Sequence, residues 1–563
     1  MAKLPRIAAT LSLVASLFAQ VDAISKVSRS GRYLYTDDGT RFYIKGVAYQ
    51  PQGTVDTNSA FGEPSTFIDP LADSDGCNRD LPFLKQLGVN TVRVYSVDSA
   101  QNHDSCMSAL SGAGIYTIID LSLPLNGSID RTSPSWSTNI LDQYLETINV
   151  FNKYDNVLAF NVGNEAVISN TTDVAPFIKA AARDVRSYLT SISSSALVGY
   201  AAIDGASNFR VPLANFLSCD PTNSNSGAAS IDLYGLNNYE WCGDSSFEGA
   251  YTGVEGDYSG YNVAAYFSEY GCITSPPRLW TEVGALFSTQ MSPVWSGGIA
   301  FSYFPASSVQ GQFGMVNISS DGKTVTTSAD FTRLQSQYGN VTSPPNTPSG
   351  GSSQATYPSC PGQNSSFAAS TTLPPTPNTD ACNCLESTLG CTFKPPTSNY
   401  SAVVGELINT ACGLLGQAGA TCNDIAGNGS SGVYGPVSGC DPTIKLSWSM
   451  NQYYQLQNRQ PEACQFAGNG SVNPLGASGT ASASAAETSC ISNPSATFTP
   501  SLPSGISTNS PGSSSGSSSG SGSGSSGSGK GNGAVPLIAN SQALLGMLTI
   551  VVVGVASGIW TIS

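Results

Sequence analysis

Two short strings place glutamates in a pattern typical of an enzyme that breaks glycosidic bonds. NVGNE at 161–165 and FSEYG at 267–271 both follow apolar runs, and they supply Glu165 and Glu269. A glycosidic bond breaks through an oxocarbenium-like transition state, so one carboxyl must protonate the leaving oxygen while a second stabilises or attacks the anomeric carbon. Asn164 adds an amide that can bond the sugar 2-hydroxyl. An isolated Asn-Glu pair is more often a loop or a helix cap, so the functional interpretation depends on the scaffold.

Eight short apolar runs, with amphipathic segments between several of them, predict that scaffold. The expected strands are 42–48, 89–97, 115–121, 157–162, 196–203, 231–236, 263–267 and 298–304. Continuous apolar strands alternating with helices indicate a parallel sheet, and eight of them fit an α/β fold, the (β/α)₈ or TIM barrel. Between the first two runs, segment 81–88 has helical spacing and ends in Gly88, a suitable C-cap. Barrel active sites lie at the carboxyl ends of the strands, where Glu165 follows the fourth run and Glu269 the seventh.

Other side chains near the predicted strand ends leave alternatives open. Four more acids compete with the two glutamates: Asp98, Asp120, Asp204 and Glu240. Glu240 is either a false catalytic candidate or a group that supports the acid network, and the supporting role is favoured. Tyr49 and Tyr239 either stack on sugars or pack in the barrel mouth. The lone histidine, His103, is expected to be a surface residue beside a disulfide.

The composition excludes several classes of function. A formal net charge of −15 disfavours nucleic acid and anionic membrane surfaces as partners, because both require a basic patch on the protein. The single histidine and the lack of Cys/His clusters at zinc spacing predict that no metal is used, and no cofactor is expected. An even number of cysteines, 14, and eight Asn-x-Ser/Thr sequons indicate a secreted glycoprotein.

Both ends of the chain have the composition of processing signals. Residues 1–23 combine basic residues, an apolar stretch and a small-residue cleavage site, as in a signal peptide. The apolar tail 543–560 is long enough to enter a bilayer, yet no basic cluster follows it. Small residues at 532–534 and the spacer 535–542 precede this tail, which predicts GPI attachment at Asn532. The alternative is an ordinary single-pass anchor, which the missing basic residues disfavour.

The cysteines divide the chain between these ends. Cys360, in a connector rich in Ser, Pro and Thr, completes an even set of six with the five barrel cysteines and is expected to tie the connector back to the barrel. Eight more between 382 and 490 predict a second, smaller disulfide-rich domain with four internal bridges, whose pairing the spacing leaves open. The predicted organisation is a signal peptide (1–23), a (β/α)₈ catalytic domain (24–341), the connector (342–380), a cysteine-rich module (381–492), a Ser/Gly-rich spacer (493–532) and a GPI-attachment propeptide (533–563).

Five separated motifs extend the two-acid pattern to a family resemblance. They are YIKGVAYQ (43–50), NTVRVY (90–95), GNE (163–165), YGLNNYEWCG (234–243) and FSEYGC (267–272). Together they resemble the fungal GPI-anchored β-1,3-glucanosyltransferases of glycoside hydrolase family 72. The resemblance covers roughly residues 24–490, since the cysteine-rich module is similar to carbohydrate-binding modules of family 43.

The resemblance implies a retaining mechanism, with Glu165 as the general acid/base and Glu269 as the nucleophile. The sugar-binding residues that it implies are Tyr95, Asn164, Asp204, Arg210 and Tyr303. Of these, Asp204 and Arg210 are expected to contact the acceptor, and Tyr303 is expected to face the cleft from the end of the eighth strand.

The implied function is cleavage within a β-1,3-glucan donor and transfer of its new reducing end to the non-reducing end of an acceptor glucan. We expect a monomer held by its GPI anchor on the extracellular face of the plasma membrane, or located in the cell wall. Two alternatives remain: an endo-β-1,3-glucanase that uses the same residues with water as the acceptor, and a non-catalytic wall glycoprotein that only binds glucan. Product length tests the first alternative, and any activity excludes the second.

Overall fold

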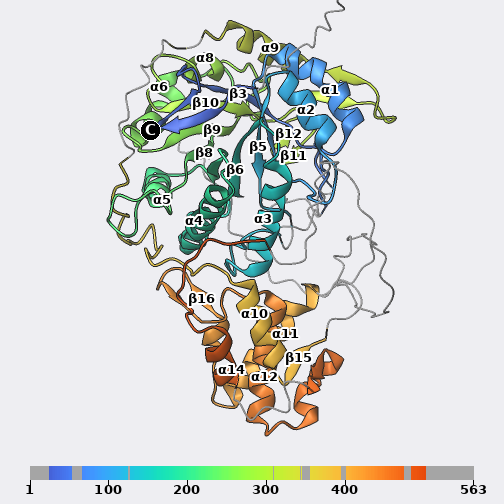
Figure 1. Ribbon diagram of the computed structural model, residues 1–563. Coiled ribbons are helices and arrows are strands. Elements are labelled where there is room, and N and C mark those ends of the chain that lie inside the picture. The colour runs from blue at the N-terminus through green and yellow to red at the C-terminus, as the bar shows by residue number, and fades with distance from the viewer. Residues whose placement is uncertain are drawn as a thin grey trace, which may run out of the picture. The chain divides into compact units, whose positions relative to one another are not determined.

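Eight parallel strands close into a barrel in the computed structural model of this protein (Figure 1). The structure describes residues 24–53, 66–124, 127–308, 310–342, 344, 356–394, 401–474 and 483–502. Each barrel strand pairs with its neighbours in chain order, and β10 pairs with β3. The strands are β3 (Ile44–Ala48), β4 (Thr91–Val94), β5 (Tyr116–Asp120), β6 (Val157–Asn164), β7 (Leu197–Ile203), β8 (Leu233–Asn237), β9 (Ala264–Tyr270) and β10 (Trp295–Ala300). The predicted (β/α)₈ barrel is therefore confirmed.

The eighth strand begins and ends earlier than the predicted 298–304. β10 ends at Ala300 because the backbone then leaves the parallel ladder. The amide of Phe301 donates to the Tyr270 carbonyl, and the amide of Tyr303 donates to the Ala48 carbonyl. This path of the backbone changes the position of the Tyr303 side chain.

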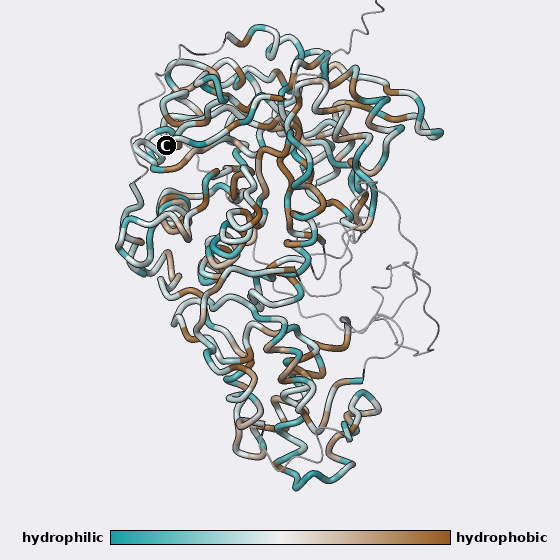
Figure 2. Tube along the Cα trace, viewed as in Figure 1, coloured by the Kyte–Doolittle hydropathy of each residue, from teal (hydrophilic) through white to brown (hydrophobic). Residues whose placement is uncertain are grey.

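The barrel strands are stable because both of their faces are buried. Val92, Val94, Ile118 and Ile119 are all 0% exposed. One apolar core lies inside the barrel, and a larger core fills the space between the strands and the helices. Figure 2 shows hydrophobic residues concentrated along the central strands. This two-sided burial explains why the strands appear in the sequence as continuous apolar runs.

Helices surround the barrel (Figure 1). They are α1 (Ser74–Leu87), α2 (Asp104–Gly112), α3 (Thr138–Phe151), α4 (Ala175–Ser191), α5 (Ser207–Ser218), α6 (Phe247–Ala250), α7 (Thr252–Asp257), α8 (Glu282–Leu286) and α9 (Ala329–Asn340). In α1, the Asp73 side chain accepts from the Gly76 amide, and Gly88 ends the helix with a φ of 70°. A left-handed cap favours glycine, and the expected C-cap is confirmed. Short antiparallel pairs accompany the barrel: β1 (Val27–Ser30) with β2 (Tyr33–Thr36), β11 (Ser307–Ser308) with β12 (Gly311–Gln312), and β13 (Val316–Ile318) with β14 (Val325–Thr327).

A smaller domain follows and is built around four disulfides. Its elements are α10 (Thr379–Thr388), β15 (Cys391–Phe393), α11 (Ser401–Gln417), β16 (Gly427–Asn428), β17 (Val433–Tyr434), α12 (Pro442–Leu456), β18 (Gly470–Val472) and α14 (Ala483–Cys490). The bridges are Cys382–Cys440, Cys384–Cys490, Cys391–Cys464 and Cys412–Cys422. All eight cysteines pair within the module, as predicted. Because its two apolar cores are small, the module depends on cross-links that restrict its unfolded chain.

The barrel and its connector share the other three disulfides. They are Cys77–Cys106, Cys242–Cys272 and Cys219–Cys360. The last bridge ties the connector to the end of α5, as the cysteine count predicts. The described part of the connector also adds to the barrel core, which the sequence did not predict. Phe367 is 0% exposed, and its ring packs against that of Phe216 with 5.5 Å between centroids.

Hydrogen bonds join the module to helix α3 and the residues just before it. Three pairs define a contact that we call the α3 seam: Thr138 with Gly439 (2.9 Å), Ser135 with Lys445 (2.8 Å) and Asp142 with Thr379 (3.1 Å). In the last pair, the threonine hydroxyl donates to the carboxylate. The seam therefore places a carboxyl of the barrel beside the first turn of α10.

The predicted signal peptide, most of the spacer, including Asn532, and the propeptide lie outside the described residues. In the part of the chain that the structure describes, no helix has the length and apolar character needed to cross a membrane.

Candidate active site

Glu165 and Glu269 lie at the same end of the barrel, where the carboxyl ends of the strands meet. Glu165 directly follows β6, and Glu269 is the penultimate residue of β9. Asn237, the last residue of β8, is in register with Glu269 and donates a hydrogen bond to Glu165. The barrel thus brings together two carboxyls that are far apart in the sequence.

The backbone of Glu165 is in the left-handed region, with a φ of 49°. This conformation is uncommon for residues other than glycine and costs about 1 kcal/mol or more. The Glu165 amide donates to the Ala201 carbonyl at 2.8 Å, and its carbonyl accepts from Arg131 Nε at 3.1 Å. The pairing of β6 with β7 also changes register between Asn161 and Asn164. Backbone strain of this kind concentrates at functional sites, where the surrounding contacts maintain it.

Glu269 is 8% exposed, and its carboxyl accepts three hydrogen bonds. Arg93 Nη1 donates to its Oε1 at 3.2 Å, and the Tyr95 hydroxyl donates to the same oxygen at 2.8 Å. The Tyr239 hydroxyl donates to Oε2 at 2.8 Å. Both oxygens are therefore held by protein donors, and Tyr239 contacts the carboxyl directly rather than serving only to pack the barrel mouth.

Arg93 links Glu269 to the rest of the site. Its guanidinium is 0% exposed and donates to Asp120 Oδ2 at 2.7 Å and to Asn164 Oδ1 at 2.8 Å. One buried cation thus faces two carboxylates, Asp120 and Glu269. Burial raises the pKa of Glu269 to about 7; the charge of Arg93 opposes this shift, and the charge of Glu165 adds to it.

A second polar cluster lies at the ends of β7 and β8. Arg210 is 5% exposed, and its guanidinium contacts three carboxylates: Asp204 at 2.9 Å, Glu240 at 3.1 Å and Asp257 at 2.7 Å. Burial raises the pKa of Glu240, and the nearby charge of Asp204 raises it further. Glu240 thus belongs to the Arg210 cluster.

The expected position of Tyr303 in the cleft is wrong. Its side chain is 0% exposed, and its hydroxyl donates to Asp80 Oδ1 at 3.1 Å. Tyr49 is buried beside it and donates to Asp80 Oδ2 at 2.9 Å. Because the chain leaves the ladder after Ala300, the Tyr303 ring packs against the Tyr49 ring, with 5.6 Å between centroids. Both tyrosines therefore pack in the protein rather than offering a surface to sugar.

The expected surface position of His103 is also wrong. The ring is 1% exposed, lies 4.4 Å from the Phe151 ring between centroids, and has its Nε2 within 2.8 Å of Asp69 Oδ2. The residue is close to the bridged Cys106 in the sequence, as expected, but Phe151 and Asp69 cover it.

Aromatic side chains surround Glu269 as well. The ring of Phe301 contacts those of Tyr95 and Phe313, with centroid distances of 6.2 and 5.2 Å, and Phe313 also contacts Tyr239 at 5.6 Å. Phe301 follows β10 directly and is partly exposed. Aromatic faces at a partly open site suit the apolar CH faces of sugar rings.

The sequence interpretation missed three residues of this site: Arg93, Asn237 and Phe301. Arg93 carried a usable signal, since a charged residue inside the apolar run 89–97 requires a buried partner. Asn237 lies within YGLNNYEWCG (234–243), one of the five motifs that carry the family resemblance. In the sequence, Phe301 looks like an ordinary core aromatic residue. Only the closed barrel places it at this site.

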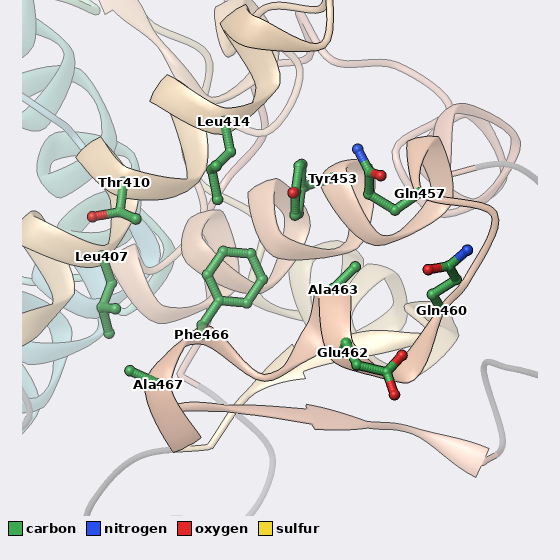
Figure 3. A pocket seen from close by; sticks show the side chains of 10 residues that line it. All are labelled: Leu407, Thr410, Leu414, Tyr453, Gln457, Gln460, Glu462, Ala463, Phe466 and Ala467. Carbon is green, nitrogen blue, oxygen red and sulfur yellow. The ribbon is translucent and has the colours of Figure 1, made fainter.

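The module carries a groove of its own, about 530 Å³ in volume, between α11, α12 and the loop after α12. Figure 3 shows its lining: Leu407, Thr410, Leu414, Tyr453, Gln457, Gln460, Glu462, Ala463, Phe466 and Ala467. The Tyr453 and Phe466 rings meet edge to face, with 6.0 Å between centroids. Among the lining residues, the polar groups are amides, hydroxyls and a single carboxylate.

Comparisons with known proteins agree with this geometry. The family model of glycoside hydrolase family 72, described as glucanosyltransferase, matches residues 13–342, and a model of the X8 domain matches residues 389–471. The 1,3-beta-glucanosyltransferase gas1 of Schizosaccharomyces pombe is 38% identical over 466 residues, covering 81% of each chain. The 1,3-beta-glucanosyltransferase of Arthroderma benhamiae is 38% identical over 449 residues, covering 78% of each.

A solved structure matches over both domains. Saccharomyces cerevisiae Gas2p in complex with laminaritriose and laminaritetraose aligns with a TM-score of 0.72 and 33% sequence identity, covering 82% of this chain and 100% of that chain. The family model spans more than half of the chain, and the relatives are similar over most of their length. The chain therefore belongs to the glucanosyltransferase family, glycoside hydrolase family 72.

Proposed function

We propose that the chain is a retaining β-1,3-glucanosyltransferase that elongates cell-wall glucan. It cleaves within a β-1,3-glucan, holds the new reducing end on Glu269 and transfers it to the non-reducing end of a second glucan. The observation that carries the proposal is the support of Glu269, whose carboxyl accepts three hydrogen bonds, two of them from tyrosine hydroxyls, at the same end of the barrel as Glu165.

This support assigns the roles. Burial raises the pKa of Tyr95 and of Tyr239 well above the ordinary value, so both hydroxyls keep their protons and act as donors. Donors and a nearby cation favour the ionised form of a carboxyl. These donors stabilise the carboxylate form that a nucleophile needs, so Glu269 is assigned as the nucleophile and Glu165 as the general acid/base.

The reaction follows from these roles. Glu269 attacks the anomeric carbon of a glucan unit while Glu165 gives its proton to the leaving glycosidic oxygen, which releases the part of the donor that carries the old reducing end. Glu165 then takes the proton of the incoming 3-hydroxyl, whose oxygen displaces Glu269 and forms a new β-1,3 bond. Two displacements at one carbon give net retention.

Transfer rather than hydrolysis depends on the acceptor. Glu165 activates water and a sugar hydroxyl equally, so occupancy of the acceptor site decides between them. The aromatic group of Tyr95, Tyr239, Phe301 and Phe313 supplies surfaces for a bound glucan, and the proposed contacts of Asn164 with the donor and of Asp204 and Arg210 with the acceptor complete the site. Relatives named 1,3-beta-glucanosyltransferases and the Gas2p complex with laminari-oligosaccharides support this choice of substrate.

The test is incubation of the secreted protein with a reduced laminari-oligosaccharide and measurement of product sizes. We expect products longer than the substrate, and we expect Glu165→Gln and Glu269→Gln to remove nearly all activity from folded protein. Products that are all shorter than the substrate would establish the endo-β-1,3-glucanase alternative. Loss of activity in Glu240→Gln together with an active Glu269→Gln variant would show that the nucleophile assignment is wrong.

We also propose that the module binds glucan through its groove and assists the barrel with long chains. The Tyr453 and Phe466 rings offer stacking surfaces, and the Gln457 and Gln460 amides can bond neutral hydroxyls. Tyr453→Ala is expected to weaken retention of the protein on insoluble β-1,3-glucan and to leave the rate on short oligosaccharides at the wild-type value.

The proposed location is the extracellular face of the plasma membrane or the cell wall, with the mature monomer linked to a GPI anchor at Asn532. The sequence of the tail supports this proposal. Release from cells by a phosphatidylinositol-specific phospholipase, with a C-terminal peptide that ends at Asn532, is the expected result. A mature protein that yields a peptide from 544–560 would refute it.

A further inference from the structure

Arg278 is a buried arginine between β9 and α8 whose guanidinium bonds to three backbone carbonyls. The residue is 4% exposed. Its Nη1 donates to the Gly271 carbonyl at 3.3 Å and to the Phe301 carbonyl at 2.7 Å, and its Nη2 donates to the Phe313 carbonyl at 2.7 Å. The guanidinium thus joins the backbone segments that follow β9, β10 and β12.

All three carbonyls belong to segments that surround the proposed nucleophile. Gly271 comes two residues after Glu269 in the sequence. Phe301 and Phe313 are the two phenylalanines of the aromatic group, and their rings contact each other with 5.2 Å between centroids. The backbone under these two rings is therefore fixed by one side chain that lies behind the site.

Arg278 continues the connection between β9 and β10 beyond the end of their ladder. The last pair of the parallel ladder is Ala300 with Tyr270, after which the Phe301 amide donates to the Tyr270 carbonyl at 2.9 Å. The next two carbonyls, those of Gly271 and Phe301, cannot bond to each other because both are acceptors. Arg278 Nη1 donates to both of them and so replaces the backbone hydrogen bonds that the departing chain has lost.

Other contacts fix the guanidinium itself. Asp330, in the first turn of α9, accepts from Nε at 3.1 Å, and the same carboxylate oxygen lies 3.0 Å from Nη2. The guanidinium carbon of Arg278 lies 4.2 Å from the centroid of the Trp280 ring. Gly271 has a φ of 116°, and a Cβ there would lie 2.4 Å from this ring, so only glycine allows the chain to pass. The donors of Arg278 therefore point in fixed directions.

We propose that Arg278 is a positioning residue for glucan binding, which holds the backbone of Phe301 and Phe313 so that their rings stay beside the nucleophile. This inference deepens the proposed function and rests on it, because it takes the aromatic group as the surface that binds glucan. The Glu269 carboxyl has donors of its own, so loss of Arg278 is expected to affect binding more than chemistry.

The first test is the kinetics of Arg278→Lys with a laminari-oligosaccharide. Lysine keeps the charge, but one ammonium cannot reach three carbonyls and Asp330 together. We expect KM to rise about 3- to 10-fold while kcat stays within about 2-fold of wild type. The ratio of transfer to hydrolysis is expected to fall, because the acceptor is held less well. A mere loss of folded enzyme would lower kcat and leave both KM and this ratio unchanged.

The second test asks whether Arg278 acts through the Phe301 ring. Arg278→Lys is combined with Phe301→Ala, and the four KM values of the double-mutant cycle are compared. Because the ring is already absent from Phe301→Ala, the rise in KM that Arg278→Lys causes is expected to be at least about 2-fold smaller in that background than in the wild type. Equal rises in both backgrounds would overturn the inference.

Arg186→Lys is the matched control. Arg186 also donates to a backbone carbonyl, that of Ser230 at 2.6 Å, and pairs with an aspartate, Asp232, at 2.8 Å. Asp232 directly precedes β8, so this arginine lies at the opposite end of the barrel from the site. Its replacement is expected to lower the melting temperature and to leave KM and the transfer ratio at their wild-type values.

Asp330→Ala provides a second route if Arg278→Lys is not secreted as folded protein. It keeps the arginine and removes its ion-pair partner, so KM is expected to rise about 2- to 5-fold with the same fall in the transfer ratio. A KM and a transfer ratio equal to those of wild type, in Arg278→Lys or in this substitute for it, would overturn the inference.

The wild-type enzyme separates this failure from that of the proposed function. If wild type elongates the oligosaccharide and Arg278→Lys matches it, only the role of Arg278 is refuted. If wild type yields only products shorter than the substrate, the transferase proposal is refuted, and the KM for hydrolysis then tests Arg278 in the same way.

Discussion

Arg93 Nη1 lies 3.2 Å from Glu269 Oε1, and both side chains are buried in the barrel. The same guanidinium is 2.7 Å from Asp120, so its single charge serves two carboxylates. The cation therefore compensates Glu269 only in part, which agrees with the raised pKa of that carboxyl. The cation and the hydrogen-bond donors thus support the carboxylate form of the proposed nucleophile, while burial opposes it.

This arrangement predicts the effect of Arg93→Lys. A lysine ammonium cannot reproduce the fork that reaches both carboxylates, so Glu269 is less well compensated and holds its proton to higher pH. We expect kcat to fall by at least about 10-fold and the acid limb of the pH–rate profile to move upward. Arg183→Lys, which changes an arginine bonded to Asp184 and the connector, is the control and should keep the wild-type limb. An Arg93→Lys limb that is unchanged or lower would contradict this account.

The two tyrosine hydroxyls on Glu269 give a second prediction. Tyr95→Phe and Tyr239→Phe each remove one hydrogen bond to a charged group, worth about 1.5 kcal/mol, so each is expected to slow the first step by about 10-fold. Stopped-flow measurement with an activated donor isolates that step. Tyr270→Phe is the matched control, because the Tyr270 hydroxyl contacts that of Tyr338 instead. Equal rates in all three variants would mean that the hydroxyls do not support the nucleophile.

A third prediction separates Tyr303 from Arg210. Tyr303→Phe removes a buried hydrogen bond to Asp80, so we expect a lower melting temperature and a wild-type ratio of transfer to hydrolysis. Arg210→Ala leaves Asp204, Glu240 and Asp257 uncompensated beside the proposed acceptor site, so elongation should fall relative to hydrolysis. Chromatography of the oligosaccharide products measures this ratio. A lower ratio of transfer to hydrolysis in Tyr303→Phe, together with an unchanged ratio in Arg210→Ala, would show that Tyr303 lies in the cleft.

A fourth prediction concerns the α3 seam. Burial raises the pKa of Asp142 to about 6, the Thr379 hydroxyl opposes the shift, and Glu146 adds to it. The folded protein therefore binds this proton more tightly than the unfolded chain, whose carboxyl has a pKa near 3.9. The stabilisation is fully present below about pH 4 and is lost as pH rises to about 6.

Asp142→Asn removes this dependence. At pH 7 the free energy of unfolding of the variant is expected to exceed that of wild type by about 1 kcal/mol, after allowance for solvent screening, so the variant melts at a higher temperature. Near pH 4 the two proteins are expected to be equally stable. Melting curves measured by calorimetry across this range test the expectation. The prediction is contradicted if the stability of the wild type rises between pH 4 and 6 relative to that of Asp142→Asn.

The sequence predicted the barrel and both glutamates for a physical reason. Buried parallel strands require continuous apolar runs, and the topology then places whatever follows each run at one end of the barrel. Contacts between strands were not predictable in this way. Three strands separate Arg93 in β4 from Asn237 in β8 along the sequence, and only the closed barrel brings the two side chains within 3.5 Å. Tyr303 was misplaced because the departure of the backbone after Ala300 depends on hydrogen bonds to two other strands.

The left-handed backbone conformation of Glu165 creates a conflict between catalytic activity and stability of the fold at a single residue. Glycine adopts this conformation without strain, so Glu165→Gly is expected to yield a dead enzyme that is no less stable than wild type. Selection for heat resistance alone would consequently favour replacements that destroy catalysis at this position. An engineering campaign on this scaffold needs an activity requirement in every round, because thermal tolerance by itself leads away from the working enzyme.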